Sequence, residues 1–200
     1  MITAISLLLS LGTPVSQDAT DEYLAYLANF DKFRAITGAM ISRGGPVSQG
    51  SVWTFRIGVG GRSAYFGANR EMHCDGKVTY MYSPDENKYL VEKPSAWQSA
   101  AAFGKRFSSP ACTLPIAIVA KDGEYERRKV RVFTLIRREA DPYDLIVSSD
   151  KSPPIAIRMG GSQATYVTEF IELHFDRRPS EASWDWNPPK GAVQATSIKD

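Results

Sequence analysis

The sequence predicts an α+β fold, in which a single, highly curved antiparallel sheet carries α-helices against its concave face. Three observations lead to this prediction. An amphipathic helix pattern comes early, short strand patterns of period two then follow one another, and a helical interruption near residue 95 divides the strands into two groups. Two hundred residues are enough for one hydrophobic core, and no linker in the sequence is long enough to separate two domains.

The first element is a helix over residues 18 to about 36. Apolar residues recur there at spacings of three and four, behind the capping-type residue Asp18. A second, short helix is expected at 95–103, where several alanines favour helix. The apolar segment 114–120, next to a proline, fits either a helix or a strand.

Strand patterns make up most of the remaining chain. Glycine, proline and Asp-Gly pairs separate them, as expected for a meander of neighbouring antiparallel strands. The expected strands are 39–43, 51–59, 62–68, 71–74, 78–82, 88–92, 129–137, 144–148, 155–159 and 164–175.

The clearest turn signal is the pair Asp75-Gly76. Glycine accepts the positive φ of a tight reversal without a steric penalty. In the strand that follows, Val78, Tyr80 and Tyr82 share one face. The pattern therefore predicts a hairpin with an aromatic strand face.

The charge of the chain is too small to indicate a polyanionic partner. The formal net charge is only +2, although residues 124–138 hold six Lys or Arg against two acids. This run alternates as a strand with a charged outer face does. Because neither a basic helix nor a binding motif accompanies it, we expect no binding of nucleic acid.

The first seventeen residues form a separate unit in the domain prediction. Residues 2–11 (ITAISLLLSL) are apolar and too short to span a bilayer. They fit a cleaved export signal or an ordered apolar N-terminal segment. Residues 18–200 are expected to form one domain, a soluble monomer that contacts membrane proteins only transiently.

Cysteine and histidine are too few for a metal centre. Cys74 and Cys112 form either one disulfide or two buried thiols. His73 and His174 fall on different expected strands, so no metal-ligand cluster is expected. The glycines of 58–61 precede no helix, and no G-x-S-x-G motif is present. We therefore expect neither an enzyme nor a cofactor.

Four segments in one order carry a resemblance to a known family. They are the helix at 18–36, the strand QGSVWTFR at 49–56, the turn and strand DGKVTYMYSP at 75–84, and WDWNPPKGA at 184–192. Together they resemble the LolA-like superfamily, which contains the periplasmic carrier of outer-membrane lipoproteins. Ile57 stands where that family has proline, and the closing motif has tryptophan where phenylalanine is usual, so the chain resembles a diverged branch.

The resemblance implies an unclosed β-barrel with a helical lid in a periplasmic or otherwise exported protein. Its function would be to carry a lipid, or the acyl chain of a lipoprotein, in a hydrophobic cavity. Arg56 would donate hydrogen bonds to lid carbonyls until the ligand enters. The expected cavity and lid residues are Leu24, Leu27, Phe30, Arg56, Val78, Tyr80 and Tyr82.

Two alternatives stay open at the level of sequence. The same aromatic side chains fit an ordinary filled core as well as a cavity. The superfamily also contains sensor proteins, so a sensor or scaffold domain that binds an envelope protein is the alternative function.

Overall fold

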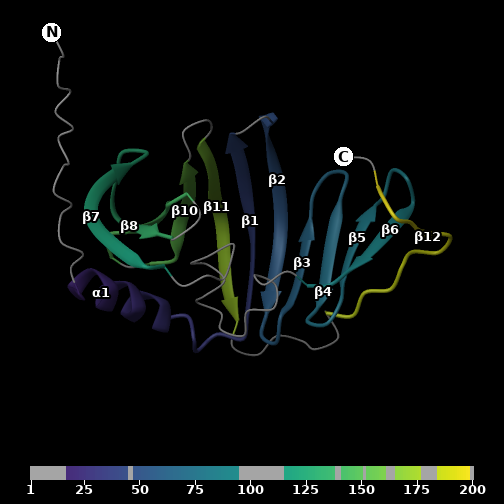
Figure 1. Ribbon diagram of the computed structural model, residues 1–200, viewed down its shortest axis with the longest axis horizontal. Coiled ribbons are helices and arrows are strands. Elements are labelled where there is room, and N and C mark those ends of the chain that lie inside the picture. The colour runs from purple at the N-terminus through teal and green to yellow at the C-terminus, as the bar shows by residue number, and fades with distance from the viewer. Residues whose placement is uncertain are drawn as a thin grey trace, which may run out of the picture.

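The computed structural model describes residues 17–44, 47–94, 115–137, 141–150, 152–160, 165–176 and 184–198. In these ranges the chain forms one helix and a sheet of twelve strands (Figure 1). The helix is α1 (Gln17–Ala28), and the strands are β1 (Ala35–Gly44), β2 (Val47–Gly58), β3 (Arg62–Phe66), β4 (Glu71–Asp75), β5 (Thr79–Ser83), β6 (Lys88–Glu92), β7 (Ala117–Tyr125), β8 (Arg128–Ile136), β9 (Tyr143–Ser148), β10 (Pro154–Gly160), β11 (Thr165–Asp176) and β12 (Val193–Gln194).

The strands lie in the order β12-β6-β5-β4-β3-β2-β1-β11-β10-β9-β8-β7. Their neighbours along the sheet are antiparallel, except that β12 runs parallel to β6. Most pairs are hairpins of consecutive strands, whereas β1 pairs with β11 from the far end of the chain. β7 and β12 are the two edges, at opposite ends of the sheet in Figure 1. The predicted single, unclosed antiparallel sheet is thus confirmed.

The predicted reversal at Asp75-Gly76 is also confirmed. The Asp75 carboxylate accepts hydrogen bonds from the backbone N–H groups of Lys77 and Val78, at 2.7 and 2.8 Å. Gly76 has a φ of 97°, and a Cβ at this position would overlap the carbonyl oxygen of Gly60. Both the positive φ and the close backbone approach therefore require glycine.

The two faces of the sheet have different neighbours. Paired residues point to the same side of a sheet, and Ile36 pairs with both Phe175 and Ile57. The Phe175 ring lies 5.3 Å from the ring of Phe30, just after α1. We call this side the helix face. Arg56 precedes Ile57 on β2 and therefore lies on the opposite face.

A β-bulge keeps two parts of β11 on the helix face. Gly38 pairs with Leu173, but Met40, two residues further along β1, pairs with Phe170. The extra residue on β11 changes the alternation, so Leu173 and Phe170 both pack against the core of the helix face. Ile171 lies within the bulged part and is 58% exposed.

Several local predictions need correction. The helix was expected to run to residue 36, but α1 ends at Ala28. Tight turns follow it, with hydrogen bonds such as Phe30 N–H to Leu27 O at 3.0 Å. Ala35 and Ile36 instead pair within the sheet. Segment 114–120 leads into strand β7. The helix expected at 95–103 and the N-terminal apolar run lie outside the described residues.

The expectation of a solvated outer face on β8 is wrong for the centre of that strand. Phe133 and Leu135 are fully buried on the helix face, and Val130 and Val132 are buried on the opposite face. Both faces of β8 are therefore covered. Of the helices predicted to cover the sheet, the described residues contain α1, which packs at the β7–β9 end. No helix in the described ranges is long and apolar enough to cross a membrane.

Candidate functional site

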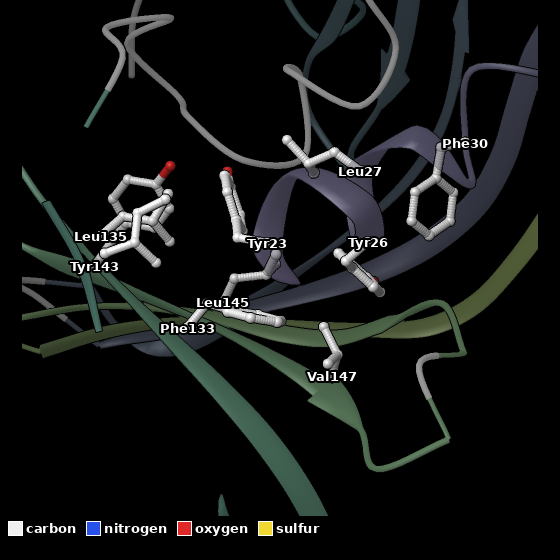
Figure 2. Close-up of a cluster of buried hydrophobic side chains, with 10 residues drawn as sticks. Tyr23, Tyr26, Leu27, Phe30, Phe133, Leu135, Tyr143, Leu145 and Val147 are labelled. Atoms are coloured by element: carbon white, nitrogen blue, oxygen red, sulfur yellow. The ribbon is translucent and has the colours of Figure 1, made fainter. Parts of the chain in front are cut away.

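Helix α1 is fixed to the sheet by a cluster of aromatic and aliphatic side chains (Figure 2). The Tyr23 ring meets the Phe133 ring edge-on at 5.5 Å, and the Tyr26 ring meets Phe30 at 5.2 Å. The Tyr26 hydroxyl donates to the Ser152 carbonyl at 3.3 Å, and burial raises the pKa of Tyr26. The cluster comprises Tyr23, Tyr26, Leu27, Phe30, Ile118, Phe133, Leu135, Tyr143, Leu145 and Val147.

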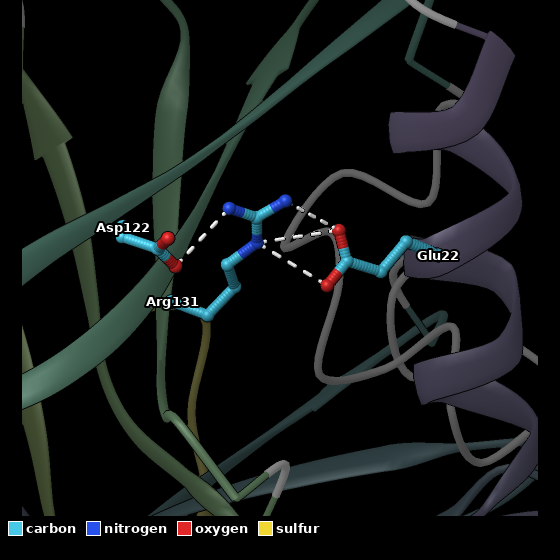
Figure 3. Close-up of polar contacts among 3 residues, drawn as sticks. All are labelled: Glu22, Asp122 and Arg131. Carbon is cyan, nitrogen blue, oxygen red and sulfur yellow. Dashed lines mark hydrogen bonds and ion pairs between the residues drawn. The ribbon is translucent and has the colours of Figure 1, made fainter.

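An ion pair adds a polar connection between α1 and the sheet (Figure 3). Arg131 of β8 donates from Nη2 to Glu22 Oε2 at 2.6 Å and from Nε to both carboxylate oxygens at 3.2 Å. Its Nη1 donates to Asp122 of β7 at 3.2 Å. Hydrogen bonding to Glu22 raises the pKa of Arg131. The side chains of Arg131 and Glu22 are only 25% and 22% exposed, so water screens this pair less than a surface pair.

Beyond α1, the helix face continues as one row of paired apolar residues across β2 to β6. The row is Phe55, Tyr65, Met72, Met81 and Leu90. Its burial falls along the sheet, because Phe55 and Tyr65 are 4% and 5% exposed whereas the last three are only partly buried. We call these last three residues the methionine row.

The methionine row lies away from α1. The partners of α1 come from β7 to β11, so the part of the chain that the structure describes places no helix over β4 to β6. Met40, Trp53 and Phe170 extend the same apolar surface on the β1 side. Thioether side chains are flexible and polarizable, which suits contact with varied apolar groups.

The opposite face of β2 to β6 carries a different arrangement, centred on Arg56. Its guanidinium lies 5.4 Å from the ring centroid of Trp184 and 5.8 Å from that of Phe66. Its Nε is buried and has no hydrogen-bond partner among the described residues, and burial lowers the pKa of Arg56. Gly58 leaves room for Trp184, because a Cβ at Gly58 would come within 2.7 Å of the indole.

His73 and Trp186 form the second half of this arrangement. Their rings stack at 5.1 Å with an interplanar angle of 22°, and His73 Nε2 is 2.9 Å from Glu71 Oε2. Burial lowers the pKa of His73, and Glu71 opposes that shift. Trp186 also contacts Tyr80 at 4.9 Å, and it contacts Tyr82 and Tyr89. We call the rings of Phe66, His73, Tyr80, Tyr82, Tyr89, Trp184 and Trp186 the aromatic patch.

The structure divides the predicted site residues into two groups. Leu27 of α1 and Phe30 just after it are buried against the helix face of the sheet, whereas Leu24 is 53% exposed. Arg56 shares the opposite face with Tyr80 and Tyr82, two members of the aromatic patch, and its ring contacts are with Phe66 and Trp184. Val78 is partly buried just before β5. The two groups are not brought together, and ligand binding by them stays a prediction.

Sequence reasoning missed two features of the site. The role of Trp184 and Trp186 was signalled by their alternation around Asp185, which is typical of a strand with one buried face. The methionine row had no comparable signal, because single methionines in strands are ordinary core residues.

The cysteine pair stays untested. Cys74 is buried, and Cys112 lies outside the described residues. Among the residues that the structure describes, no group of three His, Cys, Asp or Glu side chains is placed to hold a metal ion.

No protein-family model matches the chain, and no curated protein matches it in sequence. Solved structures match its fold. An uncharacterized conserved protein from Thermus thermophilus has a TM-score of 0.61 at 8% identity, over 88% of this chain and 98% of that one. MucB has a TM-score of 0.52 at 15% identity over 86% of this chain, which spans only 64% of the MucB chain.

LprF from Mycobacterium bovis has a TM-score of 0.50 at 8% identity, over 84% of this chain and 97% of that one. At such identities the likeness concerns the fold alone. The resemblance noted in the sequence is confirmed at the level of the fold.

Proposed function

We propose that this chain is a non-catalytic, exported binding protein whose helix face holds the acyl chain of a lipid or lipoprotein. The observation that carries the proposal is the methionine row. Met72, Met81 and Leu90 continue the buried row of Phe55 and Tyr65, yet remain partly exposed. A partly exposed apolar surface that continues a buried core is suited to an apolar ligand.

The energy available from such binding is adequate for a reversible carrier. Each buried methylene contributes about 0.8 kcal/mol, so ten methylenes contribute roughly 8 kcal/mol before ordering costs. Any rearrangement needed for entry subtracts from this gain and makes release possible. In this proposal α1 closes one end of the face, with Arg131 and Glu22 holding it in place.

The alternative is that the chain binds an envelope protein and not a lipid. MucB, whose fold this chain shares, has also been solved in complex with MucA. In the described part of the chain β7 pairs only with β8, so its outer edge presents backbone groups to which a partner strand can add. This edge favours a protein partner as the second candidate.

Native mass spectrometry tests the proposal. The full chain would be expressed with export and purified without detergent. Adducts with the masses of lipids or acylated peptides, lost on gentle activation, are expected. A protein or unmodified peptide partner in the spectrum would favour the alternative. A bare mass, together with no saturable binding of dansyl-undecanoic acid, would rule out the acyl-chain proposal.

A further inference from the structure

The aromatic patch borders a pocket of about 320 Å³ on the face opposite α1. The C-terminal segment forms its roof. Trp184 sits over Gly58, Trp186 stacks on His73, and the chain then continues to β12, which pairs with β6. The pocket therefore lies between the sheet and a segment tied down at both ends.

The pocket walls combine aromatic rings with carboxylates. Tyr80, Trp184 and Trp186 line it from the aromatic side, and Asp75 and Asp185 line it with acidic groups. The Asp75 carboxylate is held in position by the hydrogen bonds it accepts from the backbone of the turn. Electron-rich ring faces and carboxylates both attract cations.

The lining of the pocket contains two carboxylates and no Lys or Arg side chain. His73 also lines the pocket, but burial lowers its pKa, so the ring is neutral at neutral pH. Arg56 is outside the lining and lies against the rings of Trp184 and Phe66. Arg62, whose Cα pairs with that of Asp75, is also outside the lining, so the lining itself carries two carboxylates and no Lys or Arg.

We propose that this pocket binds a small alkylammonium ion, with the charge between Asp75 and Asp185 and the alkyl groups against Trp186 and Tyr80. The volume suits such a group, since ligand pockets begin at about 300 Å³. The proposal is independent of acyl-chain binding, because Tyr80 and Met81 are consecutive residues on opposite faces of β5.

The test compares two ligands of the same shape in calorimetric titrations of the full chain. Choline carries a quaternary ammonium group, and 3,3-dimethyl-1-butanol is its neutral isostere. Saturable binding of choline, at least tenfold tighter than that of the alcohol, is expected. Equal binding of the two, or no binding of choline, would overturn the proposal.

Asp185→Asn supplies the second arm, since Asp185 is exposed and the substitution preserves its shape. It should weaken choline binding at least threefold. Asp85→Asn, at an exposed aspartate in the β5–β6 turn, should leave it unchanged. Unchanged binding in Asp185→Asn would also overturn the assignment.

Flotation with phosphatidylcholine vesicles, compared with phosphatidylglycerol vesicles, then distinguishes a lipid headgroup from free choline as the source of the ammonium group.

Discussion

Arg131 and Glu22, which are 109 residues apart in the sequence, link β8 to α1 through a hydrogen bond of 2.6 Å from Nη2 to Oε2. The same guanidinium reaches Asp122 on β7. One side chain thus connects the helix with the last two strands at one end of the sheet. This connection adds to the aromatic cluster that fixes α1 to the sheet.

Arg131→Met should loosen α1 without unfolding the chain. The aromatic cluster remains, so the expected loss of unfolding free energy is about 1 kcal/mol. Backbone amides of α1 should exchange with solvent several-fold faster in hydrogen-exchange mass spectrometry. Lys121→Met, at an exposed position on β7, is the matched control. Exchange in α1 equal to that of the parent chain would show that Arg131 does not fix the helix.

Leu90→Gln and Val91→Gln test which face binds an acyl chain. The two residues are neighbours on β6 and face opposite sides, Leu90 in the methionine row and Val91 in the row of Arg56 and His73. Leu90→Gln should weaken dansyl-undecanoic acid binding roughly fourfold to fifteenfold, since it removes about one to two methylene contacts. Val91→Gln should have no effect. The reverse result would move the acyl site to the other face.

Local signals in the sequence account for the parts of the fold that it predicts well. The strand expected at 88–92 is β6 as observed, and most other strands end within a few residues of their predicted bounds. Alternation and turn residues such as Gly76 act over a few positions, so they can be read without knowing the partner strand.

Long-range pairing accounts for what the sequence did not predict. The bulge at Ile171 becomes visible only when β11 is paired with β1, and it decides that Phe170 and Leu173 share a face. The position of Arg56 relative to α1 likewise depends on which face the helix covers. A helix pattern alone does not specify this face, because both sides of β8 are apolar.

Gly58→Ala should displace Trp184. The added methyl group would lie within 2.7 Å of the indole, so the ring or the strand must shift. Such overpacking costs about 1–3 kcal/mol of unfolding free energy. Near-ultraviolet circular dichroism should change as well, since Trp184 loses its fixed environment. Gly123→Ala is the matched control, because its Cβ would lie 3.7 Å from the nearest side-chain atom, an ordinary van der Waals contact with Val132. Equal stability of the two variants would show that Gly58 is not required to seat Trp184.

His73 should make the stability of the protein depend on pH below neutrality. Burial lowers its pKa from the ordinary value of 6.5, so the unfolded chain takes up a proton at a higher pH than the folded chain does. Stability therefore falls as the pH drops through about 6.5 and continues to fall until the folded state is also protonated. Urea unfolding of the parent chain at pH 7.5, 6.5 and 5.5 should show this decline.

His73→Phe keeps an aromatic ring against Trp186 and removes the titrating group. Its loss of stability between pH 7.5 and 5.5 should be smaller than that of the parent chain. His174→Phe, at a histidine that is 66% exposed, is the control for the substitution itself. If His73→Phe retained the full slope, another group would be responsible, and the assignment of a neutral His73 to the wall of the ammonium pocket would lose its support.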